Sequence, residues 1–331
     1  MIVMFLAFAT LVPFTLGTDV FVATSRPEGA RTNLETVCAA GFRLHMIVPS
    51  LDFEHPPCLA TIQTRASVEL ELARRAPTWF AGEGSKHADF YNLARVYVME
   101  LASLKHLPEI LLMDDNVALD ADLIDDFLAS PADGALVANC KTWSRNPRTN
   151  KWTLREMKIN ETPFRPAQDK LRVFVEQWPE LRVPIETQVA WHFGFALARR
   201  SAWERAGLTE RYERALTINA REHLFASLQY ELVLAQLAWS GEVSCWKTDL
   251  TSGLGLLPAD IVESLPDSAV TQYNGKQKQW NSARRALLAD DGELPPSQPP
   301  SPPPSQPPNQ PPSQPPSAPP AAPPSVPPPD G

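Results

Sequence analysis

The sequence predicts an α/β protein with a mostly parallel sheet that is flanked by helices. Two observations predict this class. Short apolar runs alternate with helical patterns between residues 18 and 290, and the 331-residue chain, 44% hydrophobic, is long enough for one sizeable core. Strand–helix–strand repetition produces parallel strands joined by crossover helices, and ligands of such sheets bind at the carboxyl ends of the strands.

The expected elements follow in chain order. Apolar runs predict strands at 19–24, 43–50, 109–114 and 134–140. Helical patterns predict helices at 31–41, 86–106 and 120–130. The helix at 86–106 is expected to be long and amphipathic, because apolar residues recur along it at Leu93, Val96, Tyr97, Met99 and Leu101.

Residues 1–17 contain an apolar run from Ile2 to Leu16. The run is shorter than the roughly 20 residues of a membrane span, and its length suits a signal peptide or a short signal anchor. A buried first strand is the alternative. We expect the secretory pathway, with the Golgi as the location and a secreted or wall-associated form as the alternative. The sequon at Asn160 fits this location.

Residues 291–331 are rich in proline, and the sequence predicts a disordered tail of polyproline II without a core. The tail resembles the hydroxyproline-rich segments of plant and algal cell-wall glycoproteins. A stiff spacer and a ligand for a proline-binding module are the alternatives.

Charge and cysteine content limit the class of partner. The formal net charge is -8 and no long basic run is present, so no nucleic-acid partner is expected. The four cysteines, which include no CxxC pair, fit buried thiols or one or two disulfides: Cys38, Cys58, Cys140 and Cys245.

The stretch "PEILLMDDN" places Asp114, Asp115 and Asn116 at the end of an expected strand. Adjacent carboxylates repel each other unless a positive charge is near, and a hard divalent cation that bridges a diphosphate is the simplest one. The alternative is structural, because acids are common before a helix, and one is expected to start near Asp120.

Several motifs in order resemble those of family 8 glycosyltransferases, especially the plant galacturonosyltransferase-like branch. "YNLARVYVMELASLKHLPEILLMDDNVALDADL" is similar to the family's N-x-x-R helix followed by a strand that ends in D-x-D. "AWHFGFALARRSAWERAGL", "CWKTDLTSGLG" and "AVTQYNGKQKQWN" resemble three later segments of the family. The resemblance extends from Asp19 to about Arg285.

The resemblance implies a GT-A fold with a Rossmann-like nucleotide-sugar site, a UDP-sugar donor, a carbohydrate acceptor and Mn²⁺. The implied metal ligands are Asp114, Asn116 and Gln272. The implied substrate-binding residues are Ala23, Thr24, Ser25, Asn92, Arg95, Asp115, His192, Gly194, Gly275 and Lys278. Lys278 would hold the diphosphate, and Gly275 would let the backbone approach it. Gln229 is the candidate catalytic residue; a position on a helix surface is its alternative.

Three departures from the family pattern affect this site. Asn116 stands in place of an aspartate, Gln272 in place of a histidine, and Ser25 in place of an aspartate. Amide oxygens can bind a hard cation but carry no charge, so we expect a weakened Mn²⁺ site, with Mg²⁺ as the alternative. His192 and Trp191 could contact a sugar, and core positions are the alternative for both.

These observations predict a retaining hexosyltransferase. It would move a hexosyl or uronosyl group from a UDP-sugar to a cell-wall polysaccharide or a glycoprotein glycan. The first alternative is a non-catalytic binding protein that keeps the fold with an impaired metal site. The second is a structural protein in which the proline-rich tail is the functional part.

Overall fold

The computed structural model describes residues 17–73, 90–129, 131–146, 148–156, 158–159, 168–181, 188–225, 230–249, 251–252, 265 and 267–272. Several sequence predictions lie outside these residues: the apolar run 2–16, Asn160, Gln229, Gly275, Lys278 and the tail 291–331. Within the described residues, no helix combines the length and the apolar character that crossing a membrane requires.

A central sheet runs in the order β10-β6-β9-β4-β1-β2-β3. Its strands are β1 (Asp19–Ala23), β2 (Arg43–Val48), β3 (Leu59–Thr64), β4 (Glu109–Met113), β6 (Leu136–Asn139), β9 (His192–Arg199) and β10 (Val243–Cys245). Every pairing in this sheet is parallel except those of β9 with β4 and β6. The predicted mostly parallel sheet is confirmed, as are the four predicted strands, whose ends shift by one or two residues.

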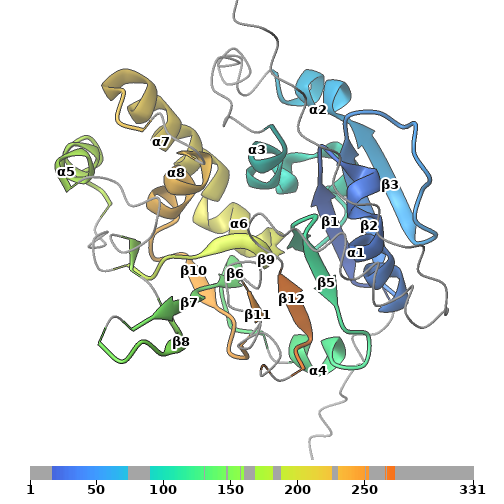
Figure 1. Ribbon diagram of the computed structural model, residues 1–331. Coiled ribbons are helices and arrows are strands. Elements are labelled where there is room, and N and C mark those ends of the chain that lie inside the picture. The colour runs from blue at the N-terminus through green and yellow to red at the C-terminus, as the bar shows by residue number, and fades with distance from the viewer. Residues whose placement is uncertain are drawn as a thin grey trace, which may run out of the picture.

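Two smaller β units lie beside the central sheet (Figure 1). One has the order β11-β12-β5, with β11 (Thr251–Ser252), β12 (Val270–Gln272) and β5 (Val117–Leu119). The other is the hairpin of β7 (Lys141–Arg145) and β8 (Trp152–Glu156). The antiparallel pairing of β12 with β5 sets Gln272 opposite Val117, so the end of the described chain returns to the carboxyl end of β4.

Helices cover both faces of the central sheet. Successive strand residues point to opposite faces, so each strand contributes side chains to two core clusters. Phe21 and Ala23 belong to the core cluster shared with α2 (Arg65–Leu72), α3 (Phe90–Val96), α5 (Gln168–Glu176), α6 (Arg200–Ala206), α7 (Leu208–Glu222) and α8 (Tyr230–Ala238). Val20 and Val22 belong to the cluster shared with α1 (Pro27–Ala39), α4 (Ile124–Leu128) and the small sheet.

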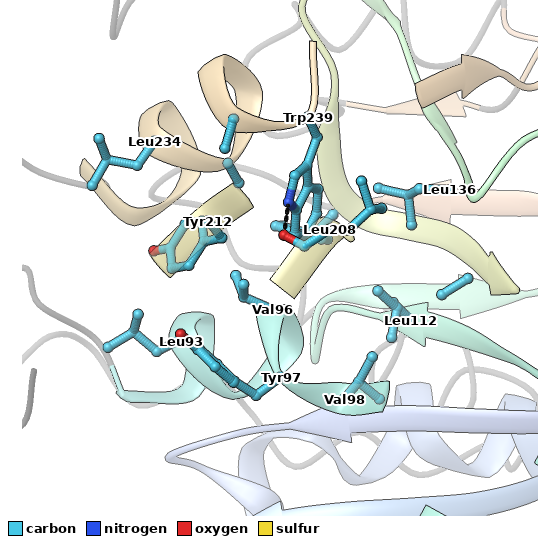
Figure 2. Packing of buried hydrophobic residues seen from close by; sticks show 14 of the residues in the cluster. Leu93, Val96, Tyr97, Val98, Leu112, Leu136, Leu208, Tyr212, Leu234 and Trp239 are labelled. Carbon is cyan, nitrogen blue, oxygen red and sulfur yellow. Dashed lines mark hydrogen bonds between the residues drawn. The ribbon is translucent and has the colours of Figure 1, made fainter. Parts of the chain in front are cut away.

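Trp239 lies at the centre of the larger cluster (Figure 2). Its indole N–H donates a hydrogen bond of 2.7 Å to the Leu208 carbonyl, and its ring stacks on Trp191 with centroids 5.5 Å apart. Trp191 is therefore a core residue, and its suggested contact with a sugar is wrong. Trp203, Trp239 and Trp246 are buried in the core as well.

The long helix expected at 86–106 is wrong in its described part. α3 ends at Val96, and two 3-10 turns follow, η1 (Val98–Glu100) and η2 (Ala102–Leu104). The apolar residues that suggested one amphipathic stripe are instead buried on all sides. The Arg200 guanidinium donates to the carbonyls of Met99, Leu104 and Leu107 at 2.6, 2.8 and 2.9 Å, which gives these carbonyls hydrogen-bond partners where the helix is interrupted.

Two other helices differ from prediction at their starts. α1 begins at Pro27, where the fixed φ of proline suits the first helical position and its missing N–H costs nothing. α4 begins only at Ile124, because the Asp120 carboxylate accepts the N–H groups of Asp122 and Leu123 in a turn before it. Asp125 and Asp126 are exposed on α4, as expected for a solvated helix face.

All four cysteines form disulfides, which settles a question that the sequence left open. Cys38–Cys58 joins α1 to the segment before β3, and Cys140–Cys245 joins the ends of β6 and β10. The first disulfide links a helix to the segment before a strand, and the second links two neighbouring strands of the central sheet.

Candidate functional site

The carboxyl ends of β1 and β4 meet at one edge of the sheet, because the two strands are parallel neighbours. Thr24 follows β1, and Asp114 and Asp115 follow β4. The Thr24 hydroxyl donates a hydrogen bond of 2.7 Å to the Asp115 carboxylate across 91 residues of sequence. Two regions that the sequence assigned to one ligand are therefore in direct contact.

Asp115 is anchored through both its backbone and its side chain. Its carbonyl accepts a hydrogen bond of 3.0 Å from Asn33 Nδ2 on α1. Its Oδ2 lies 3.7 Å from the guanidinium of Arg26, whose side chain is half exposed. Sequence reasoning missed Arg26 and Asn33. The available signal for Arg26 was its position two residues after Thr24, beyond the end of a strand.

Asp114 is held by groups from three distant segments. One carboxylate oxygen forms an ion pair with Arg95 of α3, and the other accepts a hydrogen bond of 3.0 Å from Gln272 Nε2 of β12. The Asp114 backbone N–H donates to the Gly194 carbonyl of β9 at 2.9 Å. Four of the predicted site residues therefore meet at one point.

Gly194 is a glycine because the Gln272 amide occupies the space of a side chain. A Cβ at this position would lie 2.1 Å from Gln272 Nε2 and 2.5 Å from Gln272 Oε1. No side chain fits at that distance without moving Gln272 away from Asp114. The glycine that the motif places at position 194 is therefore required sterically in this fold.

The two carboxylates of this edge are partly accessible to solvent. The side chains of Asp114 and Asp115 keep 23% and 16% of their surface exposed, although Arg95 and Gln272 beside them are buried. Acceptor oxygens and the Arg26 guanidinium are therefore presented together at a partly solvated edge.

The expected divalent cation can be tested against the residues present. Gln272 Oε1 is buried and has no hydrogen-bond partner among the described residues. A half-turn of this amide would direct its oxygen toward Asp114, where a cation between the two oxygens would be favourable. Asn116, buried beside Asp115, offers a third oxygen. The residues therefore fit a hard cation, but as one carboxylate with two neutral amides.

Two observations limit the strength of such a site. The charge of Arg95 already neutralises Asp114. Within the part of the chain that the structure describes, no group of three or more His, Cys, Asp or Glu side chains converges. Any cation here would compete with Arg95 for the same carboxylate.

Three other predicted residues lie on α3 or around the end of β1. Asn92 lies half-buried on α3, Ala23 is buried at the end of β1, and Ser25 is exposed beside Thr24. His192 opens β9, and its side chain is not among those described.

Comparison with known proteins gives one sequence relative and several similar folds. No protein-family model matches the sequence. The chain is 24% identical over 221 residues to "Probable galacturonosyltransferase 14" of Arabidopsis thaliana. The match covers 63% of this chain and 37% of that protein, so the chain spans well under half the length of its relative.

Among solved structures, an active-site mutant of LgtC has a TM-score of 0.50 at 12% identity, over 84% of this chain and 98% of that one. LgtC, a galactosyltransferase, in complex with donor and acceptor sugar analogues has a TM-score of 0.48 at 12% identity with the same coverage. Mouse xyloside xylosyltransferase 1 has a TM-score of 0.46 at 12% identity, over 79% of this chain and 98% of that one.

These findings confirm the resemblance that the motifs indicated and the fold class that followed from it. The chain has a GT-A fold and is similar, as a divergent relative, to the family 8 glycosyltransferases.

Proposed function

We propose that this chain is a retaining glycosyltransferase that binds a UDP-sugar at the edge formed by Thr24, Asp114 and Asp115. It transfers a hexosyl or uronosyl group to a cell-wall polysaccharide or a glycoprotein glycan. The observation that carries the proposal is the convergence of Asp114, Arg95, Gly194 and Gln272, residues from four segments, on one carboxyl edge. Sequence similarity to a galacturonosyltransferase supports a uronosyl or hexosyl donor.

The residues divide into two groups by their chemistry. Asp115 and Thr24 offer hydrogen-bond acceptors and a donor to the hydroxyl and amide groups of the nucleoside. Arg26 is a half-exposed cation suited to phosphate oxygens, which its guanidinium can bind through two parallel hydrogen bonds. Lys278, which lies outside the described residues, is proposed as a second cation for the diphosphate, with Gly275 beside it.

A bound Mn²⁺ or Mg²⁺ would neutralise the charge that grows on the departing nucleoside diphosphate. Asp114, Asn116 and Gln272 would hold this cation through oxygen atoms. Arg95 contributes positive charge at the same place in its absence. We therefore propose that cation binding is weak alone and stronger when the diphosphate of UDP supplies additional negative charge.

A non-catalytic binding protein is the second candidate, and one observation favours it. Both oxygens of Asp114 already have protein partners, Arg95 and Gln272. A carboxylate satisfied in this way needs no cation, so a nucleotide or glycan could be bound here without transfer.

A screen for release of UDP from a panel of hexosyl and uronosyl UDP-sugars tests the proposal. We expect at least one donor to be turned over by the wild-type chain. Asp114→Asn should reduce that turnover by about tenfold or more, since one positioned charge in an active site is worth at least that factor. Asp126→Asn on the exposed face of α4 is the control. Binding of UDP without turnover of any donor would favour the second candidate.

We also propose passage through the secretory pathway. Disulfides persist in oxidising compartments, and all four cysteines of the chain are paired. The proposed location is the Golgi, with a secreted or wall-associated form as the alternative.

A further inference from the structure

The β7–β8 hairpin carries an aromatic face that belongs to neither core cluster. Trp143 pairs with Leu154 and Arg145 pairs with Trp152, so these four residues share one face, which we call the tryptophan face. Trp143, Trp152 and Leu154 are half-buried, and none of them is among the buried or partly buried residues of the two clusters. Two tryptophans that keep accessible surface therefore lie on one face of the hairpin.

The strand register fixes the spacing of the two tryptophans. Trp152 lies diagonally across from Trp143, because the residue directly opposite Trp143 is Leu154. Diagonal neighbours on one face of an antiparallel pair are about 7–8 Å apart. Two aromatic rings at this spacing suit an extended ligand that presents apolar groups at a similar interval.

The chain itself contains a segment of this kind. Residues 295–329 hold 20 prolines in a P-P-x-x repeat that begins with "PPSQPPSPPPSQPPNQ". The repeat sets prolines three residues apart, as Pro296 and Pro299 are. A polyproline II helix has three residues per turn, so such prolines share one face at an interval of about 9 Å. Segments with this P-x-x-P pattern dock onto the aromatic surfaces of proline-binding modules.

The turn of the hairpin concentrates positive charge in an acidic protein. Residues 141–158 hold six basic residues and a single acid, whereas the whole chain carries a formal net charge of -8. Asn146 Oδ1 accepts the backbone N–H of Arg148 at 2.9 Å within the turn. Arg145, Arg148 and Lys151 are exposed there and form no ion pair with any of the residues that the structure covers. Like charges at a turn repel each other, so an added anion would stabilise them.

The end of the sequence has the complementary charge. Residues 286–331 hold four acids and no basic residue. Three of these acids, Asp290, Asp291 and Glu293, come just before the first proline of the repeat, Pro295. Acids followed at once by prolines match a turn of cations followed along the hairpin by two tryptophans.

The last described strand lies near the base of the hairpin. Lys141 of β7 forms an ion pair with Asp249, two residues before β11, and β11 pairs with β12, which ends at Gln272 (Figure 1). Pro295 follows Gln272 by 23 positions in the sequence. A random coil of that length would span about 25–30 Å, so the first repeats can reach the hairpin of their own chain.

We propose that the tryptophan face binds the proline-rich segment of the same chain. Prolines of the first repeats pack against Trp152 and Trp143, and the acids before them pair with the cations of the turn. The bound segment runs from the turn toward the base of the hairpin. Tethering raises the effective concentration of the segment to the millimolar range, so a face with only two tryptophans is sufficient to hold it. This contact does not depend on the proposed transferase activity.

Carbodiimide cross-linking of the full chain, followed by mass spectrometry of its peptides, tests the contact. The reagent joins a lysine amine to a carboxylate as an amide, with loss of water, only where the two groups touch. We expect Lys151 to be joined to Asp290, Asp291 or Glu293. Lys105, which is exposed elsewhere on the domain, should not be joined to these acids.

Two single variants separate the aromatic contact from general loss of apolar surface. Trp152→Ala should lower the yield of the Lys151 cross-link by about fivefold or more, because an aromatic anchor of the bound prolines is removed. Leu70→Ala removes an apolar side chain that is 78% exposed on α2, and the cross-link yield should stay at the wild-type value.

A second pair of variants changes only exposed side chains and so tests the contact even where Trp152→Ala fails to fold. Arg145→Gln/Arg148→Gln keeps Lys151 and should lower the cross-link yield severalfold at low salt. Arg172→Gln/Arg205→Gln removes the same charge from other exposed positions and should leave the yield unchanged.

Mixing equal amounts of unlabelled and ¹⁵N-labelled chains before the reaction shows whether the two groups come from one molecule. We expect each cross-linked pair to carry a single isotope. Pairs of mixed isotope would indicate binding between two copies and would overturn the proposal. Absence of the Lys151 cross-link, or equal yields in the double variant Arg145→Gln/Arg148→Gln and its control, would overturn it as well.

Discussion

The contacts of the Asp114 side chain and backbone cannot be deduced from the family motif alone. Its carboxylate contacts Arg95 of α3 and Gln272 of β12, and its backbone N–H bonds to Gly194 of β9. The sequence identified each of these residues separately. It could not show that a cation from the protein neutralises the carboxylate, because that contact depends on how α3 packs against β1, the strand next to β4.

Arg95→Gln should raise the affinity for Mn²⁺ by about tenfold, because the Asp114 carboxylate loses its competing cation. The same change should lower the free energy of unfolding by about 1–3 kcal/mol, since a largely buried, charge-assisted hydrogen bond is lost. Calorimetry with Mn²⁺ and denaturant unfolding measure the two effects. Arg95→Lys keeps the charge and should change Mn²⁺ affinity less; equal Mn²⁺ affinity in all three proteins would show that Arg95 and a cation do not compete.

At the scale of elements, the four predicted strands were correct, but β3, β9 and β10 of the same sheet were not predicted. The runs that became β1, β2, β4 and β6 are short, apolar and enclosed on both faces, so each strand could be placed from its residues alone. Most of the segment 90–101 is buried, so its apolar residues do not mark one helix face, and periodicity suggested a helix that in fact stops at Val96. What holds it in short turns is Arg200, about a hundred residues away in the sequence.

Arg200→Met should destabilise the fold by about 2–4 kcal/mol. It removes a guanidinium that donates to three backbone carbonyls of the segment after α3, and it leaves partly buried acceptors unsatisfied. Chemical denaturation of purified protein measures the loss. Arg205→Gln, an exposed change on the same helix α6, should stay within about 0.5 kcal/mol of the wild type. A similar small effect for Arg200→Met would mean that water satisfies these carbonyls.

At the scale of the whole molecule, the resemblance predicted the GT-A fold correctly, whereas cysteine pairing depended on the structure. Spacing could not pair Cys38 with Cys58 or Cys140 with Cys245, since each pair is joined only by sheet topology. The charged hairpin was also missed, because its basic residues are interleaved with polar and aromatic ones and form no continuous run. Only the strand register of β7 and β8 gathers them.

The disulfides give a prediction for the intact protein. Chain-entropy arguments assign about 3 kcal/mol to a loop of about 15 residues and about 4.7 kcal/mol to one of about 100. Reduction should therefore lower the unfolding temperature markedly, and Cys140→Ala/Cys245→Ala should lower it more than Cys38→Ala/Cys58→Ala. Thermal unfolding with and without reductant measures this order. Protein from the native source should show no free thiol before reduction, and four reactive thiols would contradict both the pairing and the secretory location.

The central claim is that the edge formed by Thr24, Asp114 and Asp115 binds the nucleotide of a UDP-sugar. The most direct measurement is calorimetric titration of UDP, with and without Mn²⁺, into the wild type, Gly194→Ala and Gly29→Ala. A Cβ at Gly194 would collide with the Gln272 amide, whereas a Cβ at Gly29 meets only the Arg26 side chain at 3.8 Å. We predict that UDP binds the wild type, more tightly with Mn²⁺, that Gly194→Ala weakens UDP binding by about tenfold, and that Gly29→Ala leaves it unchanged. Absence of UDP binding to the folded wild type, or equal UDP affinity in the two alanine variants, would contradict the claim.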